Sequence, residues 1–196
     1  MTTPRKSGKI TKRWQQPVRV AVNLSPIQFR DPDLVATIAR TLEETGVPAS
    51  RLKLEITETV LLDDSDANLK ILHQLKALGV LIVLDDFGTG YSSLGYLQKF
   101  PFHKLKIDQS FVRPLMQQPD CQAIVRSILD LARALEIGTT AEGVETREQL
   151  QWLSREGCDQ VQGYLLGRPM PAGQVNKFLH EFVCPHIEGS TNAMTA

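Results

Sequence analysis

Residues 80–85 read VLIVLD, an apolar and largely β-branched run that ends in an acid, and a second acid, Asp86, follows directly. Such a run predicts a β-strand. Helical patterns alternate with such runs, because residues 66–78 place leucines on one face and residues 121–135 carry a second apolar stripe. Strand–helix alternation predicts an α/β fold with a parallel sheet and right-handed crossovers.

Five more segments carry the strand signal: residues 18–25, 52–57, 104–108, 137–142 and 159–164. The helices between the strands have start signals, with Asp31 as a possible N-cap before Pro32 and a capping box at Thr146 and Gln149. Two architectures fit, a doubly wound open sheet and a (β/α) barrel. A full barrel usually needs about 250 residues, and this chain of 196 residues supplies only about six β/α units.

The amino-acid composition argues against several classes of function. The 22 Lys and Arg balance the 22 Asp and Glu, so we expect no DNA-binding role that depends on excess positive charge. No apolar run is long enough to span a membrane. Cys121, Cys158 and Cys184 are odd in number and far apart, which predicts free thiols in a reducing cytoplasm.

Polar residues end nearly every predicted strand. They are Asn23, Glu55 with Glu58, Asp85 with Asp86, Lys106 with Asp108, Glu142 with Glu145, and Gln162. Parallel strands open their carboxyl ends on one face, and a barrel brings these ends together at a single mouth, where active sites lie. In an open sheet the same side chains would spread along a line. So many acids from separate strands favour the barrel.

Crowded carboxylates need a counter-charge, since like charges raise one another's pKa. A hard divalent cation, Mg²⁺ or Mn²⁺, supplies it with oxygen ligands alone. The adjacent Asp85 and Asp86 could serve two metals, the arrangement that displaces a phosphodiester oxygen, and Lys106 could hold a water or stabilise phosphoryl charge. The alternative for any one acid is a solvated strand end or a helix cap. The glycine-rich loop at residues 86–94 indicates a flexible lid beside the metals.

Six motifs together resemble the EAL family of bacterial cyclic-di-GMP phosphodiesterases. In chain order they read VNLSPIQF, LEITET, LDDFGTGYSSLGYL, KLKID, AEGVET and QGYLLGRPM, and the resemblance as a whole runs from about residue 14 to residue 182. The resemblance implies a (β/α)₈ TIM-like barrel that cleaves cyclic-di-GMP to linear pGpG with two Mg²⁺ or Mn²⁺ ions.

The resemblance also implies roles for individual residues. The metal ligands would be Asn23, Glu55, Asp85, Asp86 and Glu142. Of the catalytic residues, Lys106 would position the attacking water, Gln162 would orient the network, and Asp86 and Glu142 would complete it. Glu58 and Glu145 would support the lid loop.

One departure from the family pattern is plain, because the sequence contains no Glu-Ala-Leu tripeptide, whose Glu is a metal ligand in the family. We therefore expect an incomplete barrel that lacks the first strands, an impaired metal site and weak or lost turnover. An open barrel edge predicts a homo-oligomer or a partner chain that covers it. Refolding of residues 1–16 over the gap and a chain that is a fragment of a longer protein stay open.

The expected organisation is a basic segment at residues 1–16, the remnant of a helix, followed by an EAL-like domain at 17–183 and a disordered tail at 184–196. Two functions fit this chain. One is a cyclic-di-GMP phosphodiesterase, and the other is a non-catalytic module that binds cyclic-di-GMP or a protein. A barrel that acts on another phosphate ester would require the motif set to be a coincidence.

Overall fold

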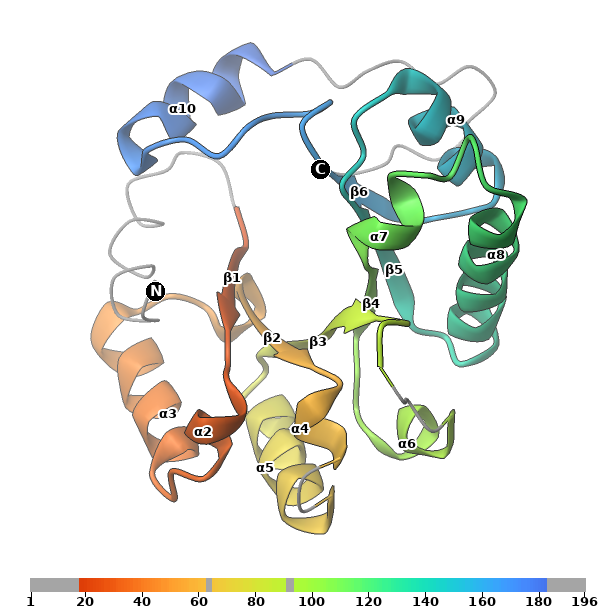
Figure 1. Ribbon diagram of the computed structural model, residues 1–196. Coiled ribbons are helices and arrows are strands. Elements are labelled where there is room, and N and C mark those ends of the chain that lie inside the picture. The colour runs from red at the N-terminus through yellow and green to blue at the C-terminus, as the bar shows by residue number, and fades with distance from the viewer. Residues whose placement is uncertain (1–17, 63–64, 91–93, 183–196) are drawn as a thin grey trace.

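The computed structural model describes residues 18–62, 65–90 and 94–182. Its centre is a six-stranded sheet in the sequential order β1-β2-β3-β4-β5-β6, with every neighbouring pair parallel. The strands curve as half of a barrel, with helices outside them (Figure 1). The predicted α/β class and incomplete barrel of six units are therefore confirmed. The expected segments at 1–16 and 184–196 lie outside the described residues.

The strands fall where the sequence predicts them, within about two residues at most ends. Their bounds are β1 Val20–Asn23, β2 Leu52–Thr57, β3 Leu81–Phe87, β4 Lys104–Ile107, β5 Gly138–Glu142 and β6 Gln160–Gln162. The first and last strands do not pair with each other, so in the described part of the chain each has one hydrogen-bonded neighbour.

Helices follow the strands and cover the outer face of the sheet. The longer ones are α3 Leu34–Thr45, α5 Ser65–Ala77, α8 Pro119–Ala134, α9 Arg147–Arg155 and α10 Ala172–Glu181. The shorter ones are α2 Pro26–Phe29, η1 Ala49–Arg51, α4 Thr59–Leu62, α6 Leu94–Lys99 and α7 Gln109–Val112. Among the described residues, no helix combines the length and the apolar character that a membrane crossing requires.

The helix caps agree with the sequence in one case and differ in another. Thr146 accepts a hydrogen bond from the Gln149 amide and completes the predicted capping box of α9. Asp31 does not cap α3, which begins at Leu34 with Asp33 at its N-cap. Instead the Asp31 Oδ1 atom accepts the Asp33 amide at 2.9 Å. This local turn precedes the helix and moves its start by two residues.

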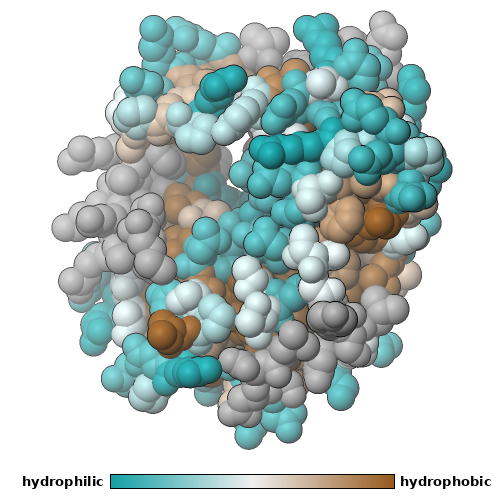
Figure 2. All heavy atoms as spheres, in the orientation of Figure 1, coloured by the Kyte–Doolittle hydropathy of each residue, from teal (hydrophilic) through white to brown (hydrophobic). Residues whose placement is uncertain are grey.

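Alternation along the strands separates an apolar outer face from a polar inner face. The outward side chains form the core against the helices, and Leu54, Ile82 and Leu105 are completely buried there. The inward side chains of β2 are Lys53, Glu55 and Thr57, all only partly buried. Hydrophilic residues gather at the centre of the same view, where the face is also hollowed (Figure 2). The sheet therefore encloses a polar space instead of a packed apolar one.

Candidate metal and catalytic site

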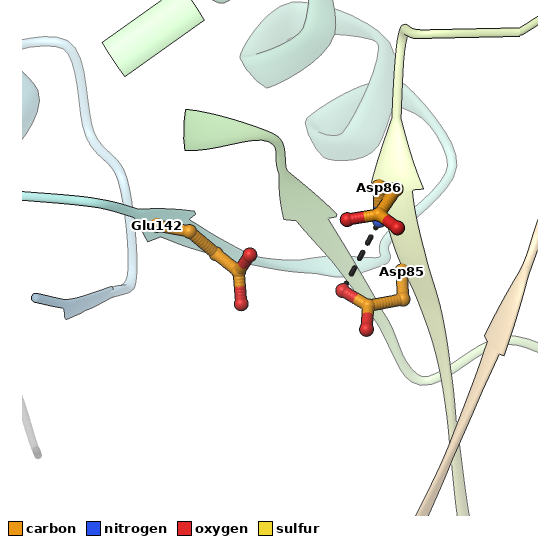
Figure 3. A group of neighbouring side chains, drawn as sticks. All are labelled: Asp85, Asp86 and Glu142. Carbon is orange, nitrogen blue, oxygen red and sulfur yellow. Dashed lines mark hydrogen bonds between the residues drawn. The ribbon is translucent and has the colours of Figure 1, made fainter. Parts of the chain in front are cut away.

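Three carboxylates converge at the carboxyl ends of two strands. Asp85 and Asp86 directly precede Phe87, the last residue of β3, and Glu142 is the last residue of β5, on the other side of β4. One oxygen from each lies within 4.8 Å of the others. Figure 3 shows the Glu142 carboxylate directed toward the two aspartates. Oxygen-only donors at this spacing fit a hard divalent cation such as Mg²⁺ or Mn²⁺.

A β-bulge explains how two consecutive residues reach one site. Successive side chains of a regular strand point to opposite faces. Here the register with β4 shifts, so that Asp85 and Asp86 together oppose Lys106 alone. Asp86 takes a left-handed conformation with φ of 54°, and its amide donates to the Asp85 Oδ1 atom at 3.1 Å. A left-handed non-glycine residue costs about 1–3 kcal/mol, a strain that is typical of functional sites.

Lys106 lies at the centre of the carboxylates. Its Nζ atom is 2.6 Å from Glu142 Oε1, 2.8 Å from Asp85 Oδ1 and 3.2 Å from Glu55 Oε2. The side chain is only 7% exposed. Burial by itself would lower the pKa of Lys106, but the attraction of Glu55 and hydrogen bonds to Asp85 and Glu142 raise it above its ordinary value. Lys106 is therefore a permanent cation that supplies part of the counter-charge.

The counter-charge of Lys106 does not satisfy every acid. Burial raises the pKa of Glu142 despite its contact with Lys106. Burial also raises the pKa of Asp86, and the neighbouring charges of Asp85 and Asp108 add to this rise. Carboxylates that hold their protons more tightly than usual indicate a site short of positive charge, which a divalent cation would supply.

Asn23 and Gln162, also predicted for the site, lie on the edge strands. Asn23 is the register partner of Glu55, and Gln162 is the register partner of Glu142. Both side chains are exposed. They therefore border the acidic cluster from the two open sides of the sheet, and their ligand and orienting roles stay predictions.

Glu58 anchors the start of the predicted lid loop. It is 6% exposed, and its Oε1 atom accepts the Gly88 amide at 2.7 Å. Gly90 lies close to the same carboxylate, because a Cβ atom there would lie 2.5 Å from Glu58 Oε2. Residues 91–93 of the loop lie outside the described part of the chain.

Glu145 has a different partner. Its Oε1 atom lies 3.6 Å from Arg113 Nε, on the residue that follows α7. Its proposed support of the lid loop stays a prediction.

Two further residues hold the site, and motif reasoning assigned neither of them a part in it. Gln149 is 4% exposed, and its Nε2 atom donates to the carbonyls of Val112 and Arg113, at the end of α7. Gly163 packs against Val144, because a Cβ atom there would lie 2.1 Å from the Val144 carbonyl oxygen. The glycine of the QGY motif is the sequence signal that could have indicated the close approach of Gly163 to Val144.

Comparison with known proteins identifies the family. The family model described as EAL domain matches residues 5–169. The bifunctional diguanylate cyclase/cyclic di-GMP phosphodiesterase MucR of Pseudomonas aeruginosa is 49% identical over 156 residues, which are 80% of this chain and 23% of MucR. The cyclic di-GMP phosphodiesterase NbdA of the same organism is 39% identical over 84% of this chain and 21% of NbdA. The chain thus spans about a fifth of the length of these curated relatives.

Solved structures with a similar fold indicate the same family. The PaMucR phosphodiesterase in complex with c-di-GMP superposes with a TM-score of 0.82 at 45% identity, over 88% of this chain and 70% of that chain. A manganese and cyclic-di-GMP complex of Klebsiella pneumoniae BlrP1 gives a TM-score of 0.78 at 33% identity, over 84% of this chain and 43% of that one. The extent of the family match, with the acidic strand ends and the parallel sheet, shows that this chain belongs to the EAL domain family.

Proposed function

We propose that this chain is a cyclic-di-GMP signalling domain that binds cyclic-di-GMP together with Mg²⁺ or Mn²⁺ and hydrolyses one phosphodiester bond to give linear pGpG. The observation that carries the proposal is the cluster of Asp85, Asp86 and Glu142 around the Lys106 ammonium. The similarity to cyclic-di-GMP phosphodiesterases and to structures that contain cyclic-di-GMP supports the same substrate.

Each residue has a part in this proposal. Asp85, Asp86, Glu142, Glu55 and Asn23 would hold the cations, which when bound would polarise the phosphoryl oxygens and neutralise developing charge. The Lys106 ammonium would orient the attacking water and stabilise negative charge on the phosphoryl group, because it is a buried cation that lies among the carboxylates of Glu55, Asp85 and Glu142.

The surrounding groups would hold this arrangement in place. Gln162 orients the water from the β6 side, since it pairs in register with Glu142. Glu58 fixes the loop that begins at Asp86 through the Gly88 amide. Glu145 would link the AEGVET motif to Arg113, the residue that follows α7. Positioning of this kind accounts for a large part of the rate of a hydrolase.

We expect turnover by this chain to be weak. The sequence contains no Glu-Ala-Leu tripeptide, so it offers one carboxylate fewer than the family resemblance implies. Loss even of a group that only orients a metal ligand lowers affinity about 10–100-fold. The buried free thiols Cys121 and Cys158 support a reducing compartment, which we propose is the cytoplasm.

The second candidate is a non-catalytic module that binds cyclic-di-GMP or a protein. The half-barrel favours it, because β1 and β6 each leave one edge unpaired within the described residues. Unpaired edges are templates for another chain. We therefore also propose that a second copy of this chain or a partner protein covers this side of the sheet.

One assay separates the two functions. Purified protein is incubated with cyclic-di-GMP and Mn²⁺, and pGpG is followed by chromatography alongside binding of cyclic-di-GMP by calorimetry. An Asp85→Ala variant is the test, and an Asp130→Ala variant, which removes an exposed acid of α8, is the matched control. Formation of pGpG that only Asp85→Ala abolishes supports the enzyme. Binding without pGpG supports a module that binds cyclic-di-GMP without cleaving it. Absence of both binding and pGpG refutes both roles toward cyclic-di-GMP and favours the protein-binding module.

A further inference from the structure

A cluster of cations lies on the inner face of the sheet, before the strand ends that carry the acids. Arg19 directly precedes β1, Lys53 is the second residue of β2, and Lys104 is the first residue of β4. Alternation places Lys53 on the side of Glu55 and Lys104 on the side of Lys106, so both point inward. On β1, Ala21 and Asn23 pair in register with Lys53 and Glu55 and share their inward face. Arg19 is two residues before Ala21, so the same alternation places it on this face. We call these three residues the inner cation cluster.

Lys104 is built into this position. The Lys104 Cε atom lies 3.3 Å from the position that a Cβ atom of Gly138 would occupy. The aliphatic part of Lys104 therefore passes over β5 at a glycine, which has no side chain to obstruct it. Its Nζ atom then donates to Gln160 Oε1 on β6 at 2.5 Å. A neutral amide accepts one of its hydrogen bonds, and no carboxylate of the described residues forms an ion pair with it.

The nearby acids are already engaged. Asp159 Oδ2 accepts the amide of Thr139 at 2.7 Å and its hydroxyl at 2.9 Å. Glu55 contacts Lys106. Burial and the charges of Lys53 and Arg19 lower the pKa of Lys104 to about 8, although Asp159 opposes this shift. The cations therefore repel one another on a partly buried face of the sheet, and the charges of Asp159 and Glu55 offset only part of this repulsion.

We propose that the inner cation cluster binds a phosphate group, at a site separate from the acidic strand ends. Arg19 directly precedes β1, and Lys53 and Lys104 lie on β2 and β4, so the three cations come from three segments on one face of the curved sheet. A compact divalent oxyanion can meet several donors from different directions at once, whereas a single carboxylate meets fewer. The ligand class is thus a free phosphate or a phosphomonoester.

The test uses thermal unfolding of the full chain in divalent-free buffer without cyclic-di-GMP, so it is readable even if the proposed hydrolysis fails. Inorganic phosphate, acetate and chloride are compared at equal ionic strength. At phosphate tenfold above its Kd, we expect the Tm to rise by about 3–6 °C. Lys104→Met and, on another strand, Lys53→Met should lose this rise. Lys70→Met, which removes an exposed cation of α5, should keep it.

Three outcomes would overturn the proposal. The first is no phosphate-specific rise in the original protein. The second is an equal rise in all variants, which would show general stabilisation by an excluded salt. The third is an equal rise with acetate, which would show a response to negative charge without selectivity for phosphate. Loss of the rise in Lys104→Met and Lys53→Met, with Lys70→Met unaffected, supports the site.

Discussion

Removal of the Lys106 ammonium should destabilise the fold as well as the site. The Nζ atom lies 2.6–3.2 Å from three carboxylates. At an effective dielectric constant near 20, each pair contributes about 5–6 kcal/mol of attraction before desolvation is subtracted. Removing one partner from a buried ionic network leaves the others uncompensated, at a net cost of about 3–5 kcal/mol. We therefore expect Lys106→Met to lose about 3–5 kcal/mol in the free energy of unfolding.

The assay is urea unfolding at pH 7 in divalent-free buffer, followed by circular dichroism. The matched control is Lys177→Met, because Lys177 is 78% exposed and lies 4.0 Å from Glu181. An exposed pair contributes less than about 1 kcal/mol, so this control should unfold almost as the original chain does. Mn²⁺ should restore part of the stability of Lys106→Met, since a divalent cation can replace the missing charge.

Equal stability of Lys106→Met and the original chain would refute the reasoning. That result would mean that the carboxylates do not depend on the ammonium for compensation.

Three further changes test the support of the site and of the sheet. Gln149→Leu removes the hydrogen bonds to the Val112 and Arg113 carbonyls and takes from the Glu145 and Thr146 amides their acceptor, so it should cost about 2–3 kcal/mol in urea unfolding. Unchanged stability would contradict the hydrogen bonds assigned to this side chain. Gly163→Ala places a Cβ atom 2.1 Å from the Val144 carbonyl oxygen, so it should lower the Tm strongly. Any binding or turnover of cyclic-di-GMP should be lost with the fold. A normal Tm would contradict the close approach. The His103 Nδ1 atom accepts the backbone amide of Ile82 at 3.1 Å. Burial and the positive charge of Lys76 lower the pKa of His103. Since the folded chain holds the neutral imidazole, stability should be complete above about pH 6.5 and fall as the pH drops below that value. His103→Asn should flatten this dependence and the exposed His73→Gln should not, and an unchanged profile in His103→Asn would count against the assignment.

The sequence by itself determined the order and type of the elements. The run at residues 52–57 became β2 with the same bounds, because its alternation and β-branched composition are local properties. The capping box of Thr146 and Gln149 is also local and formed as predicted. The predicted cap at Asp31 was wrong because a second cap-forming acid, Asp33, stands two residues later. Asp31 closes a turn by accepting the Asp33 amide, and Asp33 is the residue at the helix start.

Polar strand ends also predicted one mouth rather than a line of sites, and Glu55, Asp85 and Glu142 do meet at Lys106. Which side chains meet there depended on register. Lys106 reaches Glu55, Asp85 and Glu142 because these residues stand on strands that curve around a common space. No spacing in the sequence specifies that curvature.

Only the tertiary structure decided how Asp85 and Asp86 share one site. A strand without irregularity would place them on opposite faces, and the bulge against β4 with the left-handed backbone of Asp86 brings both inward. The same holds for the inner cation cluster, whose members are up to 85 residues apart in the chain, from Arg19 to Lys104. Pairing between strands is non-local, so the charges that a folded sheet brings together follow from register and closure, which local pattern does not encode.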